Sequence, residues 1–228
     1  MAAASSFREL QDRTLDLLSK SDATTRARVK NWINLGQSDF VMRELWPFRE
    51  ATENITTASG TQEYDLTNLT DIDSQNILSV SIQGTNEKKL SYIPFNQLRA
   101  SNPDFDADAT AVPRNYYFKA GQIGFWPAPA AAYTIAVDYY IVPTEMSNDT
   151  DTPIIPVNYR EALIHYALSL ENDFNTDPDL ALKEMNRYEE ILTLARNNLL
   201  NQPSDTGAFT ILGPADFRNH TGLRNEIN

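Results

Sequence analysis

Cysteine is absent from the 228 residues of this chain. Disulfide bonds, zinc–thiolate sites and cysteine nucleophiles are therefore excluded, and the absence is consistent with a reducing compartment. Long apolar runs are missing too: no stretch of about 18 apolar residues occurs, so we expect no membrane span. The segment 1–6 has neither the basic stretch nor the apolar centre of a secretion signal, and we expect none.

Histidine is scarce, with two residues in the chain. His165 lies between Ile164 and Tyr166 in a predicted helix, which favours a structural role over a catalytic one. His220 lies in a C-terminal segment punctuated by glycine and proline, where no rigid base would be positioned. No HExxH, phosphate-binding loop or G-x-S-x-G motif occurs. We therefore predict no catalytic, cofactor-binding or metal-binding residues, and no enzyme.

Basic residues are outnumbered by acidic ones, 19 to 31, which gives a formal net charge of −12. Such a surface disfavours tight binding to nucleic acid, although it could line a channel through which DNA passes without being held. Solubility is an alternative reason for the same acidity. The carboxylates also leave open a hydrolase that uses a pair of them, but nothing in the sequence singles out a pair.

Two clusters of alternating aspartates, which begin at Asp104 and Asp149, were compared with calcium-binding loops. Such a loop needs a glycine at its sixth position and a glutamate at its twelfth. Neither cluster has the required residue at either position. We interpret both clusters as solvated turns.

Apolar residues spaced by three and four predict helices near both ends of the chain. The second helix is expected to begin at an N-cap of Thr24 or Thr25 and to end at Pro47. Asp177 is the predicted N-cap of the last helix, with Pro178 at its first position. The predicted helical ranges are 6–20, 24–48 and 158–200, the last as an antiparallel pair. The expected apolar face of the last helix is Leu182, Met185, Tyr188, Leu192, Ala195 and Leu199.

Positive charge gathers near the start of the second predicted helix, at Arg26, Arg28 and Lys30. This placement opposes the helix dipole, so acidic neighbours would relieve it. Acidic residues of an adjacent subunit would do so and would fix the register of the contact. We therefore predict these three residues at a subunit interface.

The middle of the chain predicts about five to seven short strands in a twisted antiparallel sheet or small sandwich. The clearest hairpin runs from residue 116 to 126, the strongest strand covers 133–141, and 89–93 is expected to return antiparallel to 77–82. Its aromatic residues fit either alternate packing on two sheet faces, which we favour, or a carbohydrate-binding surface. They are Tyr116, Tyr117, Phe118, Phe125, Trp126, Tyr133, Tyr139 and Tyr140.

The expected class is α+β, an antiparallel helical bundle interrupted by a β insertion. The helical body comprises 1–50 and 156–202, the β-rich insertion 51–155, and an extended C-terminal arm 203–228. A disordered linker normally lacks as many large apolar residues as the arm carries, so we predict that it orders on a partner. A mobile terminus is the alternative. The apolar residues on which this prediction rests are Phe209, Ile211, Leu212, Phe217 and Leu223.

Several short runs, taken in order, resemble the head-to-tail adaptor proteins of tailed bacteriophages. The similarity covers about residues 10–200, and the order of the runs is more specific than any one of them. The runs are 29–35, 45–48, 62–66, 123–129, 133–135, 139–140 and 156–163. The core of this family motif is Trp32, Trp46, Pro47, Tyr64, Trp126, Pro127 and Tyr159.

The resemblance implies a structural protein of the virion neck, without a cofactor and away from membranes. It implies a ring of about twelve copies beneath the portal protein, which extends the DNA channel toward a tail, nozzle or tail-terminator protein. It also implies docking on the portal through an extended terminal segment, a role that the arm fits in character. A carbohydrate- or receptor-binding module of a tail tip is the alternative function.

Overall fold

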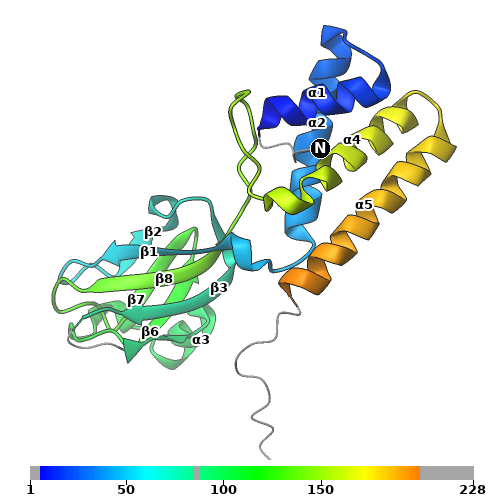
Figure 1. Cartoon of the computed structure of the whole chain (residues 1–228). Coiled ribbons are helices and arrows are strands. Elements are labelled where there is room, and N and C mark those ends of the chain that lie inside the picture. The colour runs from blue at the N-terminus through cyan, green and yellow to red at the C-terminus, as the bar shows by residue number, and fades with distance from the viewer. Residues whose placement is uncertain (1–5, 85–87, 201–228) are drawn as a thin grey trace, which may run out of the picture.

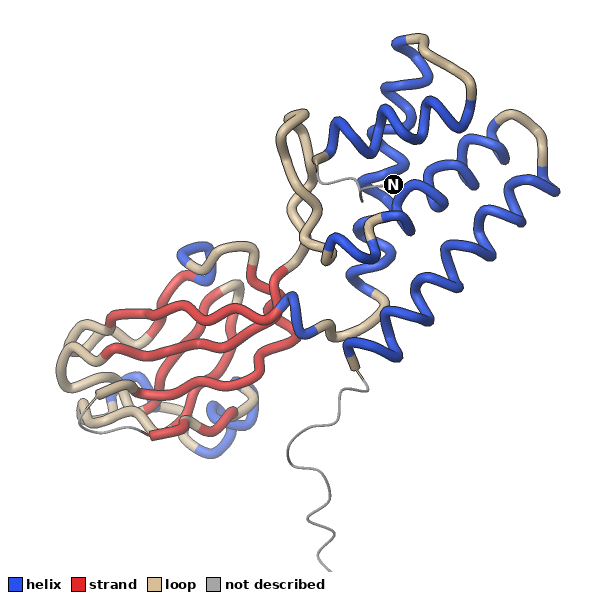
Figure 2. Tube along the Cα trace, viewed as in Figure 1, coloured by secondary structure: helices blue, strands red, loops and turns tan. Residues whose placement is uncertain are grey.

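The computed structural model describes residues 6–84 and 88–200, which form five α-helices and two four-stranded sheets (Figure 1). The predicted α+β class is confirmed, because the strands are inserted between helical segments (Figure 2). The helices are α1 (Phe7–Leu18), α2 (Ala23–Met42), α3 (Phe95–Ser101), α4 (Glu161–Phe174) and α5 (Pro178–Leu199). The strands are β1 (Glu50–Thr56), β2 (Glu63–Asp65), β3 (Ile72–Ile82), β4 (Lys88–Lys89), β5 (Ser91–Tyr92), β6 (Asn115–Lys119), β7 (Gln122–Trp126) and β8 (Thr134–Ile141). Short 3-10 helices are η1 (Pro47–Arg49), η2 (Leu66–Asn68), η3 (Phe105–Ala107) and η4 (Val157–Tyr159).

Side-chain caps fix the starts of the first two helices. The Ser6 hydroxyl accepts a hydrogen bond from the Glu9 N–H, and the Glu9 carboxylate accepts one from the Ser6 N–H, which forms a capping box. At α2 the cap is Asp22, whose carboxylate accepts the Thr25 N–H at 2.8 Å. The predicted caps Thr24 and Thr25 are therefore wrong. A carboxylate is the better acceptor here because it also interacts favourably with the positive end of the helix dipole.

The second helix ends earlier than predicted, at Met42 rather than at Pro47. Trp46 takes an extended backbone before the proline, and its indole lies between two rings. Its ring centroid is 5.2 Å from that of Phe40 and 5.7 Å from that of Phe48. The Trp46 Nε1–H also donates to the carbonyl of Phe40 at 2.8 Å. Burial of this aromatic stack therefore competes with further helix, and the chain turns back.

The helices α4 and α5 form the predicted antiparallel pair (Figure 1). Asp177 is the N-cap of α5, accepting the Leu180 N–H at 3.2 Å, and Pro178 is the first residue, as predicted. The apolar face was placed wrongly at Leu182, which is 62% exposed, whereas its neighbour Ala181 is buried. Further along, Tyr188, Leu192 and Ala195 are buried as predicted.

The helical body has a single core cluster to which α1, α2, α4 and α5 all contribute. Met146 and Ile155 belong to this cluster, although they come from the segment that joins β8 to α4. That segment therefore packs on the helices rather than on the sheets. The division of the chain at residues 50, 156 and 203 stays a prediction.

The β body consists of two sheets whose facing side chains form a second core. The first sheet has the order β1-β8-β3-β4 and is antiparallel throughout. The second has the order β2-β7-β6-β5, and its β5–β6 pair is parallel. The predicted hairpin is confirmed as β6–β7. The predicted return strand 89–93 is instead divided between the two sheets around Leu90, which is buried in the core.

Gly124 allows the closest packing in the second sheet, and its replacement is our first prediction. An added Cβ would overlap the Cζ and Cε2 atoms of Tyr117, its buried cross-strand neighbour. We expect Gly124→Ala to lower the free energy of unfolding by about 2 kcal/mol, measured by urea titration. In a Tyr117→Leu background the same substitution should cost much less, since the overlapping ring atoms are gone. Equal costs in both backgrounds would contradict this account.

Candidate functional site: a charged seam and an interdomain joint

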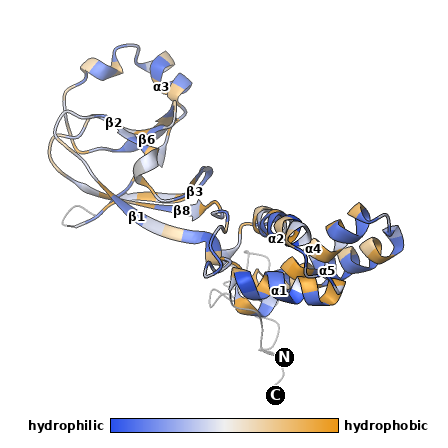
Figure 3. Cartoon of the chain, turned by 90° about the horizontal axis from the view of Figure 1, so that it is seen from above, coloured by the Kyte–Doolittle hydropathy of each residue, from blue (hydrophilic) through white to orange (hydrophobic). Residues whose placement is uncertain are grey.

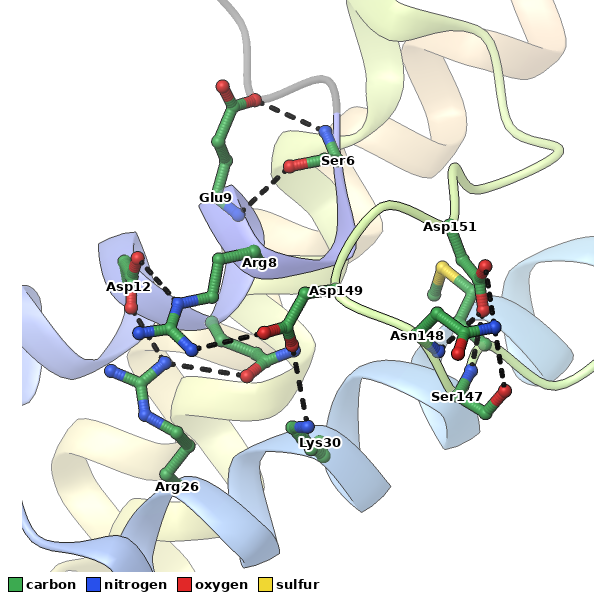
Figure 4. Close-up of polar contacts among 12 residues, drawn as sticks. Ser6, Arg8, Glu9, Asp12, Arg26, Lys30, Ser147, Asn148, Asp149 and Asp151 are labelled. Atoms are coloured by element: carbon green, nitrogen blue, oxygen red, sulfur yellow. Dashed lines mark hydrogen bonds and ion pairs between the residues drawn. The ribbon is translucent and has the colours of Figure 1, made fainter.

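A cluster of charged residues, here called the charged seam, ties α1 and the β8–α4 segment to α2 (Figure 4). It comprises Arg8, Asp12, Arg26, Lys30 and Asp149. The Asp12 carboxylate pairs with Arg26 at 2.6 Å and with Arg8 at 3.0 Å. The Asp149 carboxylate lies 3.2 Å from Arg8 Nη1 and 3.5 Å from Lys30 Nζ. Partial burial alone would raise the pKa of Asp12, but hydrogen bonds from Arg26 and Arg8 outweigh it and lower this pKa, so the seam is charged at neutral pH.

The same segment also binds the backbone at the start of α1. The Phe7 N–H donates to the carbonyl of Asp151 at 2.7 Å, and the Arg8 N–H donates to that of Asp149 at 3.0 Å. These N–H groups belong to the first turn, which has no acceptor within the helix. Backbone hydrogen bonds from Asn148 and Ser147 lower the pKa of the Asp151 carboxyl. The aspartates that resembled a calcium loop thus cap a helix and close a turn.

The structure places the predicted interface residues Arg26, Arg28 and Lys30 along α2, each with a carboxylate of its own chain. Arg28 makes a bidentate pair with Glu171, at 2.6 and 3.0 Å. The acidic neighbours that the helix dipole requires are therefore intramolecular. Assignment of these residues to a subunit interface stays a prediction. Their charge does not require an adjacent subunit, because each residue already has an acidic partner within the chain.

Glu171 of α4 is the central acceptor of a second polar cluster. Its side chain is fully buried and accepts from Arg28, from Lys20 at 3.3 Å and from the Trp32 Nε1–H at 3.3 Å. Burial alone would raise the pKa of this carboxyl. Hydrogen bonds from Arg28, Asn175, Trp32 and Lys20 outweigh it and lower the pKa to about 2. The cluster thereby fixes α2 and the α1–α2 turn against α4.

Arg49 forms the joint between the helical body and the β body, and its guanidinium is almost completely buried. On the helical side, Nη1 donates to the carbonyls of Val41 and Glu44, at 3.2 and 3.3 Å. On the β side, Nε donates to the carbonyl of Ile141 at 2.9 Å, and Nη2 to the Asp73 carboxylate at 3.0 Å. One side chain thus bonds the end of α2, the end of β8 and β3. Seen from above, the two bodies lie side by side (Figure 3).

The residues of the family motif are structural, and they are spread over both bodies. In the helical body, Trp32 donates to Glu171, Trp46 is stacked and buried, and Pro47 opens η1. Tyr159 lies in η4, where its hydroxyl accepts from Asn198 at 3.2 Å.

In the β body, the hydroxyl of Tyr64 accepts the Ala58 N–H at 2.8 Å and closes the turn after β1. The Trp126 Nε1–H donates to the Asp108 carboxylate at 2.9 Å. Pro127 follows Trp126 through a cis peptide bond. Each of these residues fixes a turn or a chain crossing, so we interpret the motif as a set of residues that stabilise the fold.

Five of the eight aromatic residues singled out in the β insertion are buried. Tyr117, Phe125 and Tyr139 are at most 1% exposed, and Tyr116 and Tyr140 are buried too. This packing favours the interpretation of the aromatics as core and gives no support to a carbohydrate-binding surface on them. His165, predicted as structural, has Nδ1 2.7 Å from Glu184 of α5, which links α4 to α5.

Sequence reasoning missed Arg49, Glu171 and the pairing role of Asp149. None of the three had a local signal, because their partners lie far away in the sequence. The predicted arm residues, and His220, lie outside the described residues.

The protein family follows from comparison of the whole chain. The model of the SU10 adaptor protein family matches residues 5–210. Because the match covers most of the chain, the protein belongs to the SU10 adaptor family, which comprises phage head-to-tail adaptors. The resemblance inferred from the short sequence runs is thereby confirmed. A comparison with curated proteins gives no match.

As a member of this family, the protein is a structural adaptor that binds other virion proteins. The family is not known as enzymatic. The geometry agrees with a structural role, since the polar clusters described above join segments of the chain to one another. Among the described residues, no group of three metal-ligating side chains is gathered at one place. None of the described helices is long and apolar enough to cross a membrane.

Proposed function

We propose that this protein forms a ring, of about twelve copies, that binds beneath the portal at the capsid vertex and joins it to the tail. The observation that carries the proposal is the match to the adaptor family over residues 5–210. In the virion neck the ring extends the DNA channel and presents a surface to the next component, a tail, nozzle or tail-terminator protein. The net charge of −12 suits a channel that lets DNA pass without specific binding.

The two-body architecture supports a ring. A ring requires a heterologous contact, in which two different faces of each copy meet. The helical body and the β body lie side by side and are bonded through Arg49, so each copy offers two different bodies to its neighbours. In this proposal, ring contacts and portal contacts use different parts of one chain.

Electron microscopy of the purified virion neck tests the proposal. We expect a closed ring of this chain directly below the portal, with the same copy number as the mass of the purified complex gives. A chain that stays monomeric with and without portal protein would overturn the proposal. So would a particle in which the chain lies away from the vertex.

The C-terminal arm is the proposed portal-binding segment, through its apolar anchors. These are Phe209, Ile211, Leu212, Phe217 and Leu223. Each anchor contributes modestly, but binding by many copies in one ring multiplies the contributions into high avidity.

Deletion of residues 203–228 is our second prediction. The circular dichroism spectrum and unfolding midpoint should be unchanged, since the described elements end at Leu199. Portal binding, measured by co-sedimentation, should weaken at least tenfold.

Replacing the five anchors with serine should reproduce the loss. Replacing Ser204, Thr206, Asn219, Thr221 and Asn225 with alanine is the matched control and should leave binding unchanged. Unaltered portal affinity of the truncated chain would exclude the arm as the docking segment.

A further inference from the structure

The first sheet has two free edges, at β1 and at β4. The Thr57 N–H donates to the Tyr133 carbonyl, and this bond continues the hydrogen-bond ladder between β1 and β8. In such a ladder, every second residue of β1 directs its N–H and C=O groups toward β8. Thr52 and Asn54 are among the other residues, so their N–H and C=O groups point outward. Among the described residues, no backbone hydrogen bond is made on that side. On β4 the Leu90 N–H bonds the Val80 carbonyl, which leaves the backbone groups of Lys89 outward.

The two edges carry charge of opposite sign. Glu50 and Glu53 lie on β1, and Lys88 and Lys89 form β4. None of the four has an ion-pair partner within the described part of the chain, and both lysines are exposed. Charged edge strands protect a sheet from uncontrolled pairing, but protection does not require opposite signs on the two edges. Opposite signs are what a contact between one edge and the other requires.

We propose that β4 of one copy docks on β1 of the next copy, so that the first sheet continues across the subunit boundary. The strand directions fit. The sheet is antiparallel throughout, so β1 and β4 of one chain run in opposite directions. A neighbouring copy placed in the same orientation therefore presents β1 antiparallel to β4. Pairing of like edges would instead set two pairs of carboxylates, or two pairs of ammonium groups, against each other.

The geometry selects one register. Opposite residues of an antiparallel pair share a sheet face and a hydrogen-bonding direction. Placing Lys89 opposite Thr52 aligns their outward backbone groups, and both side chains then lie on the outer face, since Lys89 pairs with Ser81 and not with the buried Ile82. This register also sets Lys88 opposite Glu53.

The alternatives with the same parity are poorer. Moving the neighbour by two residues in one direction sets Lys88 opposite Ile55 and Lys89 opposite Asn54, and no carboxylate faces either lysine. Moving it in the other direction sets Lys89 opposite Glu50, whose backbone N–H already bonds the Pro47 carbonyl, so one of the backbone hydrogen bonds to Lys89 is lost. In the chosen register Lys89 also lies diagonal to Glu50, within reach of a long side chain. Glu87, which precedes Lys88, lies outside the described residues. The contact is heterologous, as a ring requires. It specifies one contact between the copies of the proposed ring, and it rests on that proposal.

Cysteine crosslinking tests the contact in a chain that has no native cysteine. The full-length variants Thr52→Cys and Lys89→Cys are purified separately and mixed with portal protein under a mild oxidant. Opposite residues of a hydrogen-bonded antiparallel pair have Cα atoms about 5.5 Å apart, within the range for a disulfide. We expect a covalent dimer from the mixture, none from either variant alone, and a ladder of oligomers from the double variant. The matched pair Asn54→Cys with Lys89→Cys should link weakly.

The outcomes separate the edge contact from the ring. The native mass of the same samples shows whether the ring is present. A ring without the mixed crosslink, or a crosslink of Thr52→Cys with itself, overturns the edge contact and leaves the ring standing. Absence of any oligomer, with or without portal, overturns the ring proposal itself.

Charge reversal gives a second readout without cysteine. The variant Lys88→Glu/Lys89→Glu should raise the concentration at which the oligomer dissociates at least tenfold, measured by mass photometry at low salt. The exposed pair Arg99→Glu/Arg114→Glu makes the same change of charge elsewhere on the β body and is the control. Equal dissociation of the two variants would overturn the contact. Circular dichroism spectra like that of the natural chain show that both variants are folded.

Discussion

Replacing Arg49 with methionine should lower the free energy of unfolding by about 3–5 kcal/mol. The substitution keeps most of the buried volume but removes the ion-pair partner of the Asp73 carboxylate, which is itself only 10% exposed and retains neutral donors from Asn76 and Gln75. It also leaves the carbonyls of Val41, Glu44 and Ile141 without this donor. An uncompensated buried charge and unmet acceptors each cost far more than an exposed pair contributes. Urea unfolding followed by circular dichroism measures the change.

The control for this prediction is Arg43→Met, which breaks exposed ion pairs to Asp39 and Glu189. We expect a loss of less than about 1 kcal/mol there. Because Arg49 bonds both bodies, its loss should also separate their unfolding, so that fluorescence and circular dichroism no longer give one midpoint. A loss no larger than that of the control, with coincident transitions, would contradict the role of Arg49 as the joint.

Replacing Glu171 with glutamine should cost about 3 kcal/mol at neutral pH. The carboxyl has an ordinary pKa of 4.5, and hydrogen bonds lower it to about 2 in the folded chain. The linked free energy is the difference between these values, at about 1.4 kcal/mol for each pH unit. The neutral amide retains an acceptor oxygen but loses the charge that faces Arg28 and Lys20.

The cost should depend on pH in a defined direction. A folded pKa below the unfolded one adds stability that is complete above about pH 4.5 and disappears as the pH falls toward 2. The natural chain and Glu171→Gln should therefore differ most at pH 7 and converge near pH 2, in urea titrations at each pH. The exposed Glu190→Gln should show a small difference throughout. A gap between natural chain and Glu171→Gln that is independent of pH would contradict this assignment.

Local patterns in the sequence were enough to predict much of the fold. The β6–β7 hairpin, the cap and proline at the start of α5, and the interruption of the helices by strands all follow from neighbouring residues. Errors arose where two local signals competed. Asp22 and the threonines after it are all good caps, and only the backbone path of the turn decides among them. Likewise, residues 89–93 look like one strand, although burial of Leu90 divides them between two sheets.

The polar clusters could not be predicted in the same way, because their partners are distant in the sequence. Arg28 and Glu171 lie on different helices, and Asp149 reaches α2 from the far side of the β insertion. Periodicity indicates which face of a helix is buried, but it does not tell which buried charge meets which. The sequence indicates that the positive residues of α2 need acidic partners, but it does not show that Asp12, Asp149 and Glu171 of the same chain supply them.

The chain passes between the two bodies twice, once at residues 43–49 on the way out and once at residues 142–143 on the way back. A pull that separates the bodies is therefore shared by two covalent connections in parallel, with Arg49 bonded to both of them. Neither connection alone transmits the whole tension. A single proteolytic nick at one crossing would leave the two bodies attached through the other.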